Sequence, residues 1–381
     1  MDLAQTAAVE ALRAEARAWL RTHVPARPLP SLETREGFAA HREWEARLYE
    51  GGWSAVSWPK EYGGRGADIF GWLAFEEEYW AAGAPGRVSQ NGISLLAPTL
   101  FDHGTAEQRS RLLPPMASGA CVWAQAWSEP EAGSDLASLR SRAVRTDGGW
   151  LLSGQKTWSS RAAFADRAFG IFRSDPGAAK PHHGLTYLMF GLRAPGVTVR
   201  PVGRLDGKPA FAEIFLDDVF VPDADVVGEP GQGWRIAMSA TGDERGLTLR
   251  SPGRFLAAAD RLNRLWREAG DPADTALRDR VADAVIGARA YRLFTQASAS
   301  RFAAGGSAGA ESSLNKVFWS RLDIALHETA LDLLGADAEA ADSAWAEGYV
   351  FALAGPIYAG TNEIQRDIIA ERLLGLPKGR R

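Results

Sequence analysis

The sequence predicts a multidomain α+β protein. We expect an N-terminal helical domain over residues 1–120, a middle antiparallel β-barrel or sandwich over 121–231, and a C-terminal helical bundle over 232–381. Apolar residues recur at helical spacing towards both ends of the chain, and between them the period changes to the alternation typical of strands. A chain of 381 residues is also long enough for two or three hydrophobic cores.

The N-terminal domain is predicted to be a set of helices joined by loops. Apolar residues from Val9 to Leu20 repeat at helical spacing, and the prolines from Pro25 to Pro30 end that helix. Thr105 and Gln108 have the spacing of a capping box, which predicts that a helix begins there. Other helices are expected at about 38–49, 69–82 and 89–103.

The middle and C-terminal domains differ in their periodicity. Strand-like alternation is seen at 150–154, 185–190, 197–202 and 211–216. Gly, Pro and Asp separate these short runs, which favours an antiparallel sheet. Helical spacing then returns over about 234–268, 275–304, 311–335, 343–354 and 361–375.

Composition excludes several classes of protein. A formal net charge of −4 gives no overall attraction to nucleic acid or to an anionic membrane. The single cysteine, Cys121, excludes an internal disulfide and a cysteine-rich metal site. His182 and His183 have no third ligand at a useful spacing, so we expect no metal site. No apolar run reaches the length of a transmembrane helix and no signal peptide is visible, so we expect a cytoplasmic protein.

Three motifs carry most of the functional information. Residues 125–135 read QAWSEPEAGSD, residues 154–160 read GQKTWSS, and residues 357–366 read IYAGTNEIQR. A loop at 58–64 adds WPKEYGG. In this order the motifs resemble those of the acyl-CoA dehydrogenase family of flavoenzymes. The resemblance covers nearly the whole chain, and it implies FAD as cofactor and no metal.

The resemblance assigns the first two motifs to the flavin ring. Ala126, Trp127 and Ser128 match the segment along the pyrimidine side of the flavin. Trp158 matches a tryptophan that packs on the isoalloxazine, and Ser160 matches a hydroxyl near flavin N5. With fourteen tryptophans in the chain, a single tryptophan would more often be a core residue than a cofactor contact, so the neighbouring motif residues matter.

The remaining matches concern the rest of the cofactor and the substrate. Gly360, Thr361 and Glu363 match the C-terminal segment that touches the flavin and its adenosine diphosphate. Ser134 matches a residue near the pantetheine and pyrophosphate of coenzyme A. The reaction implied is the removal of an α proton and a β hydride from an acyl thioester.

The catalytic base departs from the commonest family pattern. Ala359 occupies the position where the family usually has the glutamate base, and alanine cannot accept a proton. Its backbone N–H is retained and matches a donor to the thioester oxygen, so Ala359 is a candidate substrate-binding residue. Some members carry the base in a Glu-Arg pair on the first helix after the β domain, and Glu244 matches that position. The alternative is a structural Glu244 paired with an arginine. Asp243 points about 100° away on a helix, and Arg245 matches either a substrate-site residue or a member of an inter-helix ion pair.

A second departure concerns flavin binding between subunits. The family often has Arg-x-x-Phe-Gly and Gln-x-x-Gly-Gly segments that hold the pyrophosphate and adenine of a neighbouring subunit's FAD. The corresponding regions read ARAYRLF at 288–294 and LLGAD at 333–337. Weak or partner-dependent retention of FAD is the hypothesis that follows.

The resemblance also implies partners. These are an acyl-CoA or an acyl-carrier thioester as substrate, an electron-transferring flavoprotein as electron acceptor, and a homodimer or homotetramer, with a heteromer as the alternative assembly. Two other functions stay open at this point. One is a structural partner subunit that has lost its base, and the other is a flavin monooxygenase or oxidase on the same fold.

Overall fold

The computed structural model describes residues 6–245, 251–306, 309–339 and 343–379, and at 240–245 it describes the backbone alone. The chain forms two compact units. The first unit comprises Met1–Val24, Ala67–Ala84 and Arg245–Arg381. The second comprises Pro25–Gly66 and Pro85–Glu244.

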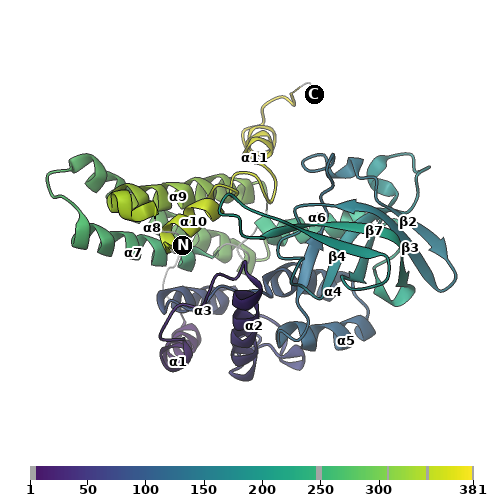
Figure 1. Cartoon of the computed structure of the whole chain (residues 1–381), viewed down its shortest axis with the longest axis horizontal. Helices are drawn as coiled ribbons and strands as arrows, with labels where there is room; N and C mark the ends of the chain where they lie inside the picture. The colour runs from purple at the N-terminus through teal and green to yellow at the C-terminus, as the bar shows by residue number, and fades with distance from the viewer. Residues whose placement is uncertain (1–5, 246–250, 307–308, 340–342, 380–381) are drawn as a thin grey trace. The chain divides into compact units, whose positions relative to one another are not determined.

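The first unit is helical. Its helices are α1 (Ala7–His23), α3 (Ile69–Ala81), α7 (Pro252–Ala269), α8 (Thr275–Ala303), α9 (Glu311–Leu334), α10 (Ala344–Ala352) and α11 (Asn362–Ile368), which continues as a π-helical turn, Ile369–Leu373. Figure 1 shows α7, α8 and α9 running alongside one another. Their shared core contains Phe255, Tyr291, Trp319 and Leu326, all buried. Apolar burial of this size provides the main stabilisation of such a bundle.

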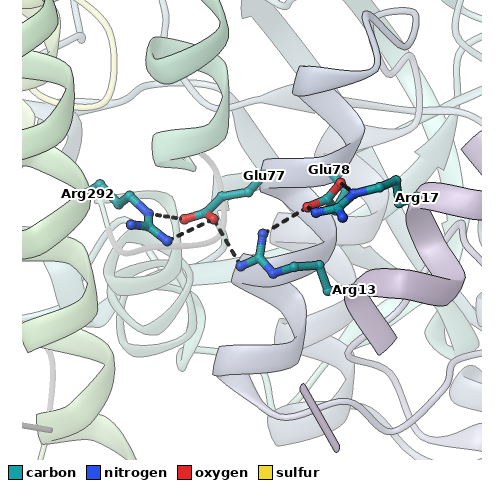
Figure 2. A network of polar contacts seen from close by, with 5 residues as sticks. All are labelled: Arg13, Arg17, Glu77, Glu78 and Arg292. Atoms are coloured by element: carbon teal, nitrogen blue, oxygen red, sulfur yellow. Dashed lines mark hydrogen bonds and ion pairs between the residues drawn. The ribbon is translucent and has the colours of Figure 1, made fainter. Parts of the chain in front are cut away.

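A network of ion pairs joins α1, α3 and α8 within this unit (Figure 2). Glu77 Oε1 accepts a hydrogen bond from Arg292 Nε at 2.6 Å, and Glu77 Oε2 accepts one from Arg13 Nη2 at 3.0 Å. Glu78 accepts hydrogen bonds from Arg13 and Arg17 at 2.8–2.9 Å. The two adjacent glutamates of α3 therefore bind arginines of two other helices.

The prediction of one continuous helix over 234–268 is wrong. The structure has α6 (Gly233–Arg245) and a separate α7 that begins at Pro252 with Ser251 at its N-cap. Proline has no N–H to donate, and its ring clashes with the preceding turn of a helix. It therefore favours the first position of a helix, where α7 has it.

The second unit contains a sheet of eight strands and several helices. The helices before the sheet are α2 (Arg35–Glu50), α4 (Ala97–His103), preceded by a π-helical turn at Gly92–Leu96, and α5 (Ala106–Ala117). The strands are β1 (Trp123–Ala126), β2 (Arg142–Thr146), β3 (Gly149–Lys156), β4 (Arg167–Arg173), β5 (Leu185–Gly191), β6 (Val197–Val202), β7 (Phe211–Pro222) and β8 (Val226–Val227). The short 3₁₀ turns are Lys60–Tyr62, Leu136–Ser138, Pro181–His183 and Asp223–Asp225 here, and Gly335–Glu339 in the first unit.

The sheet has the order β6-β7-β3-β2-β4-β5-β8, with β1 on β4. It is antiparallel as predicted, except that β1 pairs with β4 in parallel and β2 meets β4 in parallel at one residue pair. A parallel pair needs a long connection, and the chain between β1 and β4 supplies it by forming β2 and β3. That connection contains all of the second motif and, except for its first two residues, the first motif.

Helices α4 and α5 pack on the sheet through a shared core. Leu100 and Met116 from these helices lie in one buried cluster with Phe169 and Tyr187 from β4 and β5. The capping box predicted at Thr105 is confirmed, because Thr105 and Gln108 exchange hydrogen bonds between side chain and backbone. None of the helices in the described part of the chain is long and apolar enough to cross a membrane.

Candidate functional site

The ends of β1 and β3 bring the first two motifs side by side. Ala126 is the last residue of β1 and is fully buried, and Trp127 is 8% exposed. The N–H of Thr157, just after β3, donates to the carbonyl of Ser128 at 2.8 Å. This bond holds the segment after β1 against the segment after β3. The two motifs that the sequence singled out are therefore neighbours in space.

Trp158 lies on the surface with an unusual backbone. Its side chain is 61% exposed, although it is a large apolar group, and its φ is +57°. Its ring meets Phe211 edge-on, with centroids 5.8 Å apart. The next residue, Ser159, exchanges two backbone hydrogen bonds with Ala212 of β7, at 3.0 and 3.1 Å. A left-handed non-glycine residue costs roughly 1–2 kcal/mol, and such residues gather at functional sites.

Two buried polar atoms in the segments after β1 and β3 have no hydrogen-bond partner among the described residues. The indole N–H of Trp127 and the hydroxyl of Ser159 are buried and make no hydrogen bond there. The hydroxyls of Ser128 and Ser160 lie half-buried in the same two segments. An exposed aromatic side chain in the same segments as two half-buried serines fits a flat ligand with an apolar face and a polar edge, and the flavin ring of FAD is such a ligand.

Behind this surface lies a buried ion pair between Lys156 and Glu129. Nζ of Lys156 lies 2.8 Å from Glu129 Oε1. Burial lowers the pKa of Lys156 to about 8, although Glu129 opposes that shift. Burial by itself raises the pKa of Glu129, but the charge and hydrogen bond of Lys156, together with hydrogen bonds from Arg140 and Ser141, hold that pKa below its ordinary value.

The C-terminal motif lies in the helical unit and forms a left-handed turn. Ala359 has φ +54° and Gly360 has φ +80°. Thr361 is the N-cap of α11 and accepts a hydrogen bond from Ile364 N at 3.3 Å. The side-chain amide of Gln365 donates to the carbonyls of Ala359 and Gly360 at 3.2 and 3.4 Å. The backbone N–H groups of Ala359 and Gly360 make no hydrogen bond within the described chain, so they are available to a ligand oxygen.

A buried lysine supports this turn. Lys316 of α9 is 0% exposed, and its Nζ donates to Asn362 Oδ1 at 2.8 Å. Ser320 binds the same carboxamide, donating to Oδ1 at 3.2 Å and accepting from Nδ2 at 3.1 Å. Glu363 is exposed and forms a surface pair with Arg366 at 3.4 Å. The turn is thus anchored from α9, whereas Glu363 lies free of the core.

For the other predicted site residues, Ser134, Glu244 and Arg245, the structure gives fewer details. Ser134 lies exposed in the turn before β2. Glu244 and Arg245 are the last residues of α6, and their side chains lie outside the described part of the chain. The assignment of Glu244 as base stays a prediction.

Several residues that shape the site were not assigned a role from the sequence. These are Glu129, Lys156, Lys316, Asn362 and Gln365. One sequence feature could have pointed to Lys316: it directly precedes the apolar run Val317–Trp319. Such a lysine is seldom fully buried unless it has a partner, but the sequence does not say which partner it has.

Comparison with known proteins finds three protein-family models that together match almost the whole chain. The acyl-CoA dehydrogenase N-terminal domain matches residues 6–120, the middle domain matches 124–219, and the C-terminal domain matches 231–374. Acyl-CoA dehydrogenase IpdE1 of Mycolicibacterium smegmatis is 36% identical over 97% of this chain and 98% of its own length. Acyl-CoA dehydrogenase FadE26 of Mycobacterium tuberculosis is 32% identical over 100% of both chains.

Solved structures agree. The chain is similar to the Tcur3481-Tcur3483 steroid ACAD, with a TM-score of 0.87 and 28% identity over 100% of both chains. It is also similar to the ChsE4-ChsE5 complex from Mycobacterium tuberculosis, with a TM-score of 0.83 and 30% identity over 100% of both chains.

Proposed function

The chain belongs to the acyl-CoA dehydrogenase family, and on that premise we propose that it catalyses the FAD-dependent α,β-dehydrogenation of an acyl-CoA to the 2-enoyl thioester. The observation that carries the proposal is the surface at the ends of β1 and β3. There Trp158 is exposed in a left-handed conformation beside the half-buried hydroxyls of Ser128 and Ser160. When bound, FAD accepts the hydride that leaves the β-carbon of the substrate.

The protein's own residues then handle the proton and the oxygen. In the proposed mechanism, Glu244 removes the α proton, because Ala359 cannot. The free N–H of Ala359 donates to the thioester oxygen, where negative charge develops. Arg245 and Ser134 are the proposed contacts to the substrate and its coenzyme A moiety. A general base of this kind contributes about 10²–10⁴-fold to the rate.

We also propose that residues of the C-terminal turn contact FAD, as the family resemblance implies. Gly360 and Thr361 offer backbone and hydroxyl groups there, and Glu363 is exposed at the start of α11. Because the two family segments that hold a neighbour's FAD are missing, we propose that FAD is retained weakly by this chain alone. FAD that remains fully bound to the purified chain would contradict that part of the proposal.

We further propose a steroid-derived acyl-CoA as the substrate class and a second, related chain as partner. Support comes from the similarity to a steroid ACAD composed of Tcur3481 and Tcur3483 and to the ChsE4-ChsE5 complex. An electron-transferring flavoprotein is the proposed electron acceptor. The alternative is a partner subunit without a base of its own, which the alanine at position 359 favours.

The test is anaerobic bleaching of the flavin by a panel of acyl-CoAs, straight-chain and steroid-derived. The wild type, Glu244→Gln and Asp243→Asn are compared, each with and without a co-expressed partner. We expect bleaching by the wild type and by Asp243→Asn, and a loss of about 10²-fold or more in its rate for Glu244→Gln with FAD still bound. Unchanged bleaching by Glu244→Gln would exclude it as the base. Bleaching only in the complex, insensitive to Glu244→Gln, would support the partner-subunit alternative.

A further inference from the structure

A buried ion pair lies behind the Trp158 surface, and the proposed chemistry does not use it. Lys156, the last residue of β3, is 0% exposed. Its Nζ donates to Glu129 Oε1 at 2.8 Å, to Ile171 O at 2.8 Å and to Trp127 O at 3.3 Å. Each proton of the ammonium group therefore has an acceptor.

Glu129 extends the pair to a further segment. Glu129 is 8% exposed, and its carboxylate accepts hydrogen bonds from Arg140 N at 2.6 Å and from Ser141 N at 2.9 Å. These two residues lead directly into β2. The pair thus links the segment after β1, the start of β2, the end of β3 and strand β4. Because it joins four segments, the pair restricts their movement relative to one another.

The balance between the desolvation cost of the two charges and their mutual attraction indicates the role of the Lys156–Glu129 pair. Removing two charges from water costs free energy that their mutual attraction only partly restores, so a buried pair is a poor source of net stability. A fully bonded pair does favour one arrangement of the backbone over others. The backbone that it holds here is the backbone of the proposed flavin site.

We propose that Lys156 and Glu129 are positioning residues, which set the Trp127–Ser128 segment and the Thr157–Ser160 segment at the separation needed to hold a flavin ring beside Trp158. This inference rests on the proposed FAD site. Neither residue touches the cofactor in this proposal. Lys156 acts on both segments, because its Nζ holds the carbonyl of one and its backbone leads into the other.

The test compares Lys156→Met with the double variant Lys156→Met/Glu129→Gln. The single variant leaves a buried carboxylate without its cation and should lower the melting temperature strongly. The double variant removes both charges and should recover most of that loss. Arg145→Met is the matched control, since Arg145 pairs with Asp223 on the exposed surface of the same unit.

Two measurements separate positioning from stability. Hydrogen–deuterium exchange followed by mass spectrometry reports the protection of the amides at 140–141 and 157–160, and it needs no cofactor. Equilibrium dialysis gives the affinity for FAD. In the double variant we expect faster exchange at these amides and an FAD affinity lower by about tenfold or more, despite the recovered melting temperature. The control should match the wild type in both.

The inference is overturned if exchange or FAD affinity in the double variant returns to the wild-type value together with the melting temperature. A wild type that binds no FAD, even with its partner, would refute the proposed cofactor. In that case, unchanged exchange in the double variant would still overturn the positioning role, and faster exchange would support it for the two segments.

Discussion

Replacing Glu78 by glutamine removes the carboxylate that ties α1 to α3 (Figure 2). The side chain keeps its size but loses its charge and one of its two acceptor oxygens. Glu78 Oε1 accepts from Arg13 Nη1 at 2.9 Å, and its two oxygens accept from Arg17 at 2.8 Å. Glutamine can offer one oxygen in place of two and no negative charge.

The magnitude follows from how exposed each partner is. The side chain of Arg13 is 13% exposed, so its charge-assisted bond contributes about 1.5–3 kcal/mol. Arg17 is 63% exposed, so water replaces its bonds readily. Arg13 also keeps its bond to Glu77. We expect Glu78→Gln to lower the free energy of unfolding by about 2 kcal/mol.

Urea denaturation followed by circular dichroism measures this loss. Asp279→Asn is the control, because Asp279 forms an exposed pair with Arg278 at 3.1 Å, and its loss should change the free energy by less than about 0.5 kcal/mol. A loss for Glu78→Gln no larger than that of the control would refute the reasoning.

The pH dependence gives a second check on Glu78. Burial by itself raises its pKa, but the hydrogen bonds and the charges of Arg17 and Arg13 together outweigh burial and hold the pKa below the ordinary value of 4.5. A carboxyl whose pKa is lowered on folding stabilises the folded state above its unfolded pKa and loses that effect as pH falls. The difference between wild type and Glu78→Gln should therefore be constant near neutral pH and shrink below 4.5.

Three further predictions concern the candidate site. Burial lowers the pKa of Lys156 to about 8 from 10.5, so between these pH values the unfolded chain binds more protons than the folded chain. The free energy of unfolding of the wild type, relative to that of Lys156→Met, should therefore rise from pH 8 to 10 in urea titrations. A difference that does not change with pH would contradict this prediction. Lys316→Met removes the buried cation that holds Asn362 at 2.8 Å and should lower the free energy of unfolding by at least about 1.5 kcal/mol, whereas a smaller loss would mean that Ser320 suffices. Ala359→Gly relieves backbone strain at φ +54° and should raise the free energy of unfolding by about 1 kcal/mol, seen as a higher urea midpoint. A lower midpoint would show that the methyl group of Ala359 makes stabilising packing contacts.

Local features were predictable because they depend on near neighbours in the chain. The capping box of Thr105 and Gln108 needs only three residues of separation, and the structure confirms it. Apolar periodicity alone predicts one helix over 234–268, whereas the structure has two, and Pro252 is the first residue of the second. The domain limits at 120 and 231 and the role of Glu244 remain predictions.

The sequence by itself determined the family, the succession of helical, β and helical regions, and the motifs that mark the candidate site, since periodicity and motif order depend on residues that are close along the chain. Only the tertiary structure decided which buried charges meet. Lys156 finds Glu129 across 27 residues, and Lys316 finds Asn362 across 46. It also decided that Trp158, one aromatic residue among many, is exposed. Partners and exposure depend on how elements distant in sequence pack together, and a buried charge must find its partner within that packing.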